Sequence, residues 1–109
     1  MPILTTTIEG THTNQIQTAA IFKTRAINST SNAIIVEIEV QRDGHRVDHN
    51  DFALDSQERT HVVDMGAESI TLSGELKFDL SANAVIFTGG LVFSGQVNVQ
   101  MRPVIVATL

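Results

Sequence analysis

The chain has no cysteine, no tryptophan and no tyrosine among its 109 residues, and only two prolines. Without cysteine it can form no disulfide, thiolate nucleophile, iron–sulfur cluster or cysteine-ligated zinc site. Carbohydrate and single-stranded nucleic-acid sites usually stack their ligands on tryptophan or tyrosine, and here only five phenylalanines are available. These absences exclude thiol chemistry and make a lectin-like function less favoured.

Basic residues are also scarce, with seven Lys and Arg against twelve Asp and Glu and a formal net charge of −5. Binding to a nucleic-acid backbone needs clustered positive charge, so we expect no nucleic-acid partner. No apolar run approaches the roughly 18 residues of a membrane span. Residues 1–10 contain neither the basic residue nor the apolar run of a secretory signal. We therefore expect no membrane insertion, and a location in the cytoplasm or in a particle or assembly.

What the chain does contain is alternation of apolar and polar residues with a period of two. Even positions from Ile34 to Val40 are all apolar, residues 69–80 alternate more cleanly, and residues 85–101 place apolar side chains at odd positions. This period is typical of strands with one buried face. Residues 14–27 also fit a weak helical stripe, but their β-branched and aromatic residues favour a strand.

Eight candidate strands follow, at residues 3–9, 15–27, 33–42, 45–49, 59–65, 68–80, 84–94 and 96–108. Asp43-Gly44 predicts a type I′ hairpin turn, with Val40 opposite Val47 and a short return strand. The long runs on either side of residues 81–83 predict a second hairpin with Phe78 opposite Phe87. Short strands at even spacing predict one all-β domain over residues 1–109, an antiparallel β-sandwich of about eight strands with jelly-roll or immunoglobulin-like topology.

Charge is distributed unevenly along the chain. Residues 1–22 contain one charged residue, Glu9, and residues 80–109 contain one, Arg102, whereas eleven of the twelve acids lie between Glu37 and Asp79. Uncharged polar side chains tolerate burial against another chain better than charges do. The terminal strands also lack the lysines and inward charges that protect exposed sheet edges.

Two interpretations of these terminal strands remain open. They either pair with each other inside a sheet, or they dock on, or exchange with, strands of neighbouring subunits. In the second case the expected interface consists of Ile3, Leu4, Thr6, Ile8, Val104, Ile105 and Val106.

The candidates for chemistry are few. His45 and His49, with Asp48 beside them, could contribute to a divalent-metal site, but on a strand the two histidines would lie roughly 13 Å apart on one face. We therefore expect solvated histidines and no metal. No phosphate-binding glycine loop, nucleophile elbow or zinc-protease motif occurs. The sequence accordingly predicts no catalytic site and no cofactor.

We therefore expect a non-enzymatic structural subunit that self-associates through its charge-poor terminal strands into a homo-oligomer or filament. The alternative is a monomeric binding module that recognises a protein or glycan through residues 42–52. An enzyme that uses the region of His45 is the third and least favoured class.

Overall fold

The computed structural model describes residues 4–11, 17–26, 33–55, 57–67, 69–79, 81, 84–93, 96–100 and 103–108. These residues form nine strands: β1 (Leu4–Thr11), β2 (Gln17–Ala26), β3 (Ile34–Arg42), β4 (His45–Leu54), β5 (Thr60–Ala67), β6 (Ile70–Asp79), β7 (Ala84–Phe93), β8 (Gln96–Gln100) and β9 (Val104–Thr108). The described residues contain no helix, and hence none long and apolar enough to cross a membrane. The all-β prediction is confirmed.

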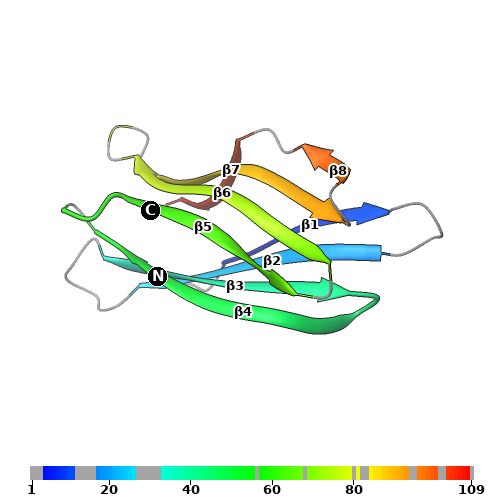
Figure 1. Ribbon diagram of the computed structural model, residues 1–109. Coiled ribbons are helices and arrows are strands. Elements are labelled where there is room, and N and C mark those ends of the chain that lie inside the picture. Colours follow the sequence, from blue (N-terminus) through cyan, green and yellow to red (C-terminus); the bar gives the residue numbers. More distant parts are fainter. Residues whose placement is uncertain are drawn as a thin grey trace.

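The strands form two antiparallel sheets that pack face to face (Figure 1). One sheet has the order β1-β2-β3-β4, and the other has the order β5-β6-β7 with both β8 and β9 paired to β7. β9 pairs with the first half of β7 and β8 with the second half, so these two strands share one edge. The predicted sandwich is confirmed. Strand order follows chain order from β1 to β4 and from β5 to β8, and only β9 departs from it by returning to β7. The described pairing is therefore that of two meanders, simpler than the Greek keys of jelly rolls and immunoglobulin domains.

The core lies between the two sheets and is built from the alternating apolar positions. The even residues from Ile34 to Val40 are fully buried, as the sequence predicts. Phe22 of β2 meets Phe87 of β7 across the interface, with ring centroids 5.0 Å apart. Phe78 is also buried, at 1% exposure. The molecule is elongated along its strands, with extents of 47 × 22 × 17 Å.

The boundaries of several strands differ from the predicted ones. The strand expected over residues 15–27 is observed as β2, Gln17–Ala26, and the return strand after Asp43-Gly44 is ten residues long rather than five. The single strand expected over residues 96–108 is replaced by two described strands, β8 and β9. Pro103, which cannot donate a ladder hydrogen bond, directly precedes β9. In the β6–β7 hairpin Phe78 opposes Val85 rather than Phe87. This two-residue shift leaves every side chain on its predicted face, so the core was assigned correctly despite the wrong partners.

The β3–β4 hairpin contains the predicted turn and an unpredicted bulge. Asp43 and Gly44 both have positive φ, 50° and 83°, as a type I′ turn requires. The register then shifts, so that Gln41 opposes Arg46 but Val40 opposes Asp48. Val47 is the extra residue, and the predicted pairing of Val40 with Val47 is wrong. Because of this extra residue, odd and even positions of β4 exchange faces at Val47.

Side chains join the two sheets along one side of the sandwich, where β4 and β5 run next to each other (Figure 1). The backbone N–H of Gly66 donates to Oδ2 of Asp48 at 2.8 Å, and Nε2 of His61 lies 2.7 Å from the carbonyl oxygen of Ala53. The His61 ring also packs on Phe52, with centroids 5.8 Å apart. These contacts close the β4/β5 side. On the opposite side, β1 lies over β8 and β9.

Candidate functional site

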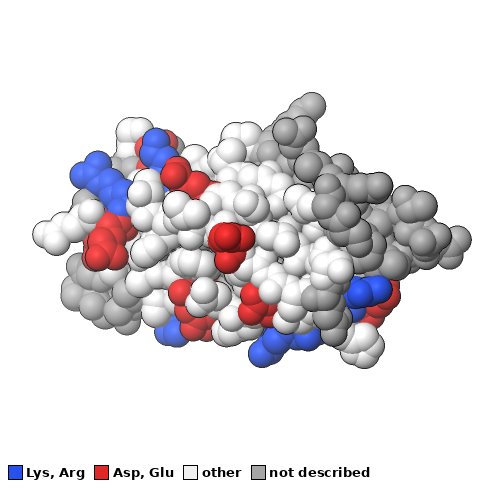
Figure 2. Space-filling view, viewed as in Figure 1, with Lys and Arg blue, Asp and Glu red and all other residues white. Residues whose placement is uncertain are grey.

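The charge-poor strands lie together on the side of the sandwich opposite β4 and β5. β1 is the last strand of one sheet, and β8 and β9 form the edge of the other. Glu9 is the single charged residue of β1, and the segments that form β7, β8 and β9 contain none. Figure 2 shows charged side chains at one end, along the margin where β3 and β4 lie, and in the middle of the visible face. Among the described residues, the first strand and the last two belong to different sheets and do not pair with each other.

The edge formed by β1 is continuous and lacks structural protection. Its eight residues pair with β2 without a register shift, and β2 is its single partner among the described strands. Alternate residues of such an edge present free N–H and C=O groups to the outside. β1 contains neither lysine nor proline. This edge can therefore accept a further strand by backbone hydrogen bonding.

The edge formed by β8 and β9 differs in each of these respects. It consists of two five-residue strands, with the exposed Pro103 before the second. Both strands show a register shift against β7, one at Leu91/Val92 and one at Val85/Ile86. Short strands, bulges and proline are the features by which proteins protect sheet edges from pairing. This second edge is therefore a poor template for strand addition.

The predicted interface residues divide between the core and the surface. Ile8 and Val104 pack against the core of their own chain, and Val106 belongs to it at 1% exposure. Ile105 is 60% exposed and Thr6 is half-buried. The side chain of Leu4 and the whole of Ile3 lie outside the described residues. A neighbouring chain would therefore meet the backbone of β1 and the exposed Ile105 rather than an apolar side-chain cluster.

The sequence analysis did not identify two exposed positions, one on β1 and one on β5. Thr7 lies near the middle of β1 with its side chain exposed, and Val62 on β5 is 76% exposed. Alternation along the strands could have identified both, since Thr7 is odd where Thr6 and Ile8 are even, and Val62 lies beside the buried Val63. Ile86, the partner of Ile105 in the register, shares the outer face of its sheet with it.

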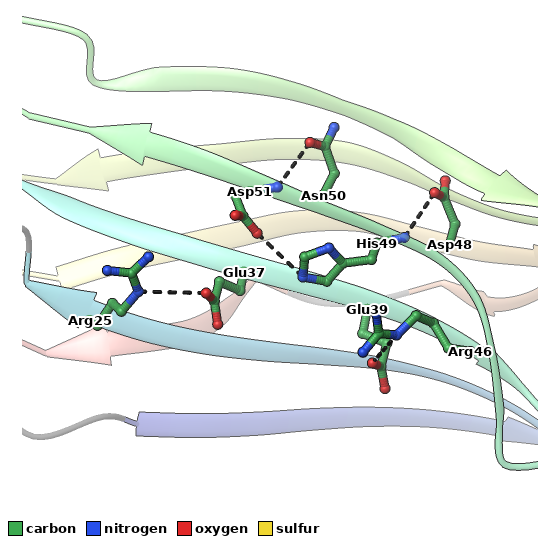
Figure 3. Close-up of polar contacts among 8 residues, drawn as sticks. All are labelled: Arg25, Glu37, Glu39, Arg46, Asp48, His49, Asn50 and Asp51. Carbon is green, nitrogen blue, oxygen red and sulfur yellow. Dashed lines mark hydrogen bonds and ion pairs between the residues drawn. The ribbon is translucent and has the colours of Figure 1, made fainter.

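A shallow groove crosses the outer face of the β1–β4 sheet and encloses about 130 Å³. Ion pairs run across its strands: Nε of Arg46 lies 2.7 Å from Oε1 of Glu39, and Nε of Arg25 lies 3.5 Å from Oε1 of Glu37 (Figure 3). The groove is lined by Ile21, Lys23, Glu37, Glu39, Arg46 and His49.

Glu39 accepts side-chain hydrogen bonds at both of its carboxylate oxygens. The side-chain amide of Gln41 donates to Oε2 of Glu39, and Arg46 donates to Oε1. The Gln41 hydrogen bond, and after it Arg46 and Lys23, hold the pKa of Glu39 below its usual value against the opposing effect of burial. The acid is therefore ionised and neutralised by its neighbours at neutral pH, which suits a role in joining strands better than a role as a general base.

The candidate metal ligands do not converge. The bulge at Val47 places the two histidines on opposite faces of β4. His45 pairs with Arg42, an inward-facing position of β3, whereas His49 pairs with Glu39 on the outer face. Figure 3 shows Asp48 pointing away from the face that carries His49. The two oxygens of Asp48 accept from the backbone N–H groups of His49 and Gly66. Within the described part of the chain no group of three His, Asp or Glu side chains is placed to hold a metal.

Two surfaces thus remain as candidates, the free edge of β1 and the mixed-charge groove on the outer face of the same sheet. Among the described strands, alternate residues of the β1 edge present backbone groups with no strand partner, whereas the carboxylates of the groove are already paired with Arg25 and Arg46. Comparison with protein-family models, with curated proteins and with solved structures finds no match to this chain.

Proposed function

We propose that this protein is a non-enzymatic structural subunit that self-associates through its charge-poor terminal strands. The observation that supports the proposal most is the position of these strands: β1 and the β8/β9 pair are sheet edges on one side of the sandwich, and the charged strands β3 to β6 lie away from it. A second copy of the chain is the partner whose surface complements an uncharged strand edge, since it supplies another.

The energetics require more than the backbone of one strand. An antiparallel pair of eight residues makes about eight hydrogen bonds, with a net value on the order of 4–12 kcal/mol in total. Association costs an estimated 4–15 kcal/mol in lost rigid-body freedom. Because these ranges overlap, a lasting contact needs the surface beyond β1 as well. The uncharged β8 and β9 supply that surface without the desolvation cost of buried charges.

The test is a charge placed in the contact. Thr7→Lys introduces a long cationic side chain at the exposed middle of β1, where strand addition would bring a neighbouring backbone against it. We expect the wild-type chain to be oligomeric at tens of micromolar by size-exclusion chromatography with light scattering. Thr7→Lys should raise the dissociation constant by at least roughly tenfold, which corresponds to about 1.4 kcal/mol.

The matched control is Thr71→Lys, which makes the same change at an exposed position of the central strand β6. It should leave the molar mass unchanged, because β6 is already paired on both sides. A wild-type chain that stays monomeric at high micromolar concentration would refute the structural-subunit proposal. Equal dissociation by both variants would place the contact elsewhere.

The second candidate is a monomeric binding module that uses residues 42–52. The observation in its favour is that Arg46 and His49, both within this segment, line the groove on the outer face of the sheet. It requires a monomeric wild-type chain and a ligand whose binding is lost in Arg46→Ala but retained in Thr7→Lys. That combination of results would establish the module in place of the subunit.

A further inference from the structure

The two free edges of the sandwich differ enough to indicate how the copies meet. We propose that β1 pairs antiparallel with β1 of a second copy about a two-fold axis, so that the β1–β4 sheets of both copies form one continuous sheet. The inference rests on the proposed function, self-association, and specifies which strands form the contact between the copies. Its alternative is a head-to-tail contact, in which β1 of one copy pairs with the β8/β9 edge of the next.

Edge protection favours the two-fold contact. A head-to-tail contact needs the β8/β9 edge, which is divided into five-residue strands, preceded at β9 by Pro103 and shifted in register at two places along β7. A two-fold contact uses the eight-residue, unshifted edge of β1 twice. Since an isologous interface needs one self-complementary surface, a single unprotected edge is sufficient.

The single charge on β1 favours antiparallel pairing and restricts its register. In a parallel, in-register pair the Glu9 residues of the two copies would lie side by side, which is destabilising. In an antiparallel pair centred on Thr7, Glu9 lies opposite Thr5 of the second copy, and the two Glu9 positions are about 13 Å apart along the strands. A register centred on Ile8 pairs equally many residues but brings the acids to about 7 Å. The register centred on Thr7 is therefore preferred.

The same axis explains why β8 and β9 also lack charge. A two-fold axis perpendicular to the sheet keeps the outer faces of both copies on one side, and therefore places both β5–β9 sheets on the other side. The β8/β9 edges of the two copies then face each other beneath the β1 pair, because β1 lies over β8 and β9 within each chain. Charged residues on those strands would have to be desolvated there, and the segments that form them contain none.

Cysteine cross-linking tests the contact cleanly, because the chain has no cysteine of its own. Directly opposed residues of antiparallel strands have Cα atoms about 4.5–5.5 Å apart, within the range that a disulfide spans. In Thr7→Cys the two introduced thiols would face each other across the axis. We expect mild oxidation at low micromolar concentration to convert most of this variant into a covalent dimer on a non-reducing gel, with the molar mass in solution unchanged from the wild-type dimer.

Two further variants complete the design. Thr71→Cys, exposed on β6, should cross-link at least tenfold more slowly than Thr7→Cys, since it lies outside the contact. Mixing Thr7→Cys with Ile105→Cys, whose cysteine is exposed on β9, tests the head-to-tail arrangement. An oligomer in which the mixed disulfide forms and the Thr7 homodisulfide does not would overturn the two-fold contact while leaving self-association intact. A monomeric wild-type chain would overturn both proposals.

Discussion

At the scale of single residues, the pairing of Gly74 with Gly89 shows most directly how the core is built. The two glycines oppose each other on the inward faces of β6 and β7, without a register shift. A Cβ on either would lie about 3 Å from Cζ of Phe87, which packs over the pair from its place in the same strand as Gly89. A glycine inside a strand often marks a bulge or a bend, but here the two glycines leave space for an aromatic ring.

The first residue-scale prediction concerns Gly89→Ala. The added Cβ would lie 2.2 Å from the carbonyl oxygen of Ser73 and 2.7 Å from Cα of Gly74, both backbone atoms that cannot move without distorting the β6–β7 ladder. We expect a loss of at least about 2 kcal/mol in the free energy of unfolding, measured by urea denaturation, from overpacking in the core.

Gly44→Ala is the matched control for that substitution. An added Cβ there meets nothing within 4 Å, and the cost comes from the positive φ of 83° alone. We expect it to lose about 1 kcal/mol. If Gly89→Ala proves no more destabilising than Gly44→Ala, then β6 and β7 do not need glycine at this position in order to approach each other closely.

At the scale of whole strands, the sides of the sandwich are closed in different ways. The β4/β5 side has no continuous backbone ladder but is joined by Asp48 to Gly66 and by His61 to Ala53. One side chain from each strand, Asp48 of β4 and His61 of β5, therefore bonds the backbone of the other strand. β1 is not paired beyond β2 among the described strands. This asymmetry is what makes β1 the open edge.

The prediction at this scale concerns Asp48, whose carboxylate accepts the Gly66 N–H across the β4/β5 side. A half-buried hydrogen bond to a charged group contributes about 1.5–3 kcal/mol. We expect Asp48→Ala to lower the free energy of unfolding by about that amount and to accelerate hydrogen exchange at the Gly66 amide. Asp48→Asn keeps an acceptor oxygen and should lose less.

Asp51→Ala serves as the control on the same strand. The Asp51 side chain is exposed and pairs with the exposed His49 at 3.4 Å, a kind of contact worth well under about 1 kcal/mol. We expect little change in stability and none at the Gly66 amide. Unaltered exchange at Gly66 in Asp48→Ala would show that the Asp48–Gly66 hydrogen bond does not hold the β4/β5 side together.

The elements of this fold were largely predictable because a period of two assigns every residue to a face. The buried even residues of β3 and the buried Phe78 and Phe87 follow from it directly. Register was less predictable. The pairing of β6 with β7 is shifted by two residues from the expected one, and the bulge at Val47 has no local signature in the sequence. The expectation that His45 and His49 share one face of the strand was therefore wrong.

The candidate site was predictable in its composition but not in its placement. Charge counting alone singled out the terminal strands, and both lie at sheet edges. The individual residues were harder to assign, because a strand with four consecutive apolar residues, such as β9, gives no alternation to separate core from surface. Val106 is buried and its neighbour Ile105 is exposed, a difference that depends on which face of β9 meets β1 and β2.

At the scale of the whole molecule, the uneven distribution of charge along the chain becomes a separation of charge between two sides of the sandwich. The middle of the chain, with eleven of the twelve acids, forms β3 to β6, and the charge-poor ends form the opposite side. Each chain carries a formal charge of −5, so two copies repel each other at long range. Association through the charge-poor side keeps most of the acids away from the contact, but it does not remove this repulsion.

The last prediction follows from that balance and concerns salt. Raising NaCl from about 20 mM to 500 mM shortens the Debye length from roughly 20 Å to about 4 Å. Repulsion between two chains of charge −5 is then screened, while backbone pairing at β1 is little affected. We expect the dissociation constant of the oligomer to fall several-fold, measured by sedimentation equilibrium. A contact built from ion pairs of the groove, such as Arg46 with Glu39, would instead weaken with salt.

Two neighbouring substitutions separate net charge from other effects of salt. Glu75 and Lys77 are both exposed on the outer face of β6, away from the proposed contact. Glu75→Gln changes the formal charge of the chain to −4 and Lys77→Gln changes it to −6, relative to −5 in the natural sequence. At low salt the first should strengthen association and the second weaken it, and the difference should disappear at 500 mM NaCl, because screening removes the long-range term. If instead Glu75→Gln weakened association at low salt and Lys77→Gln strengthened it, a local ion pair, rather than the charge of the whole molecule, would control association.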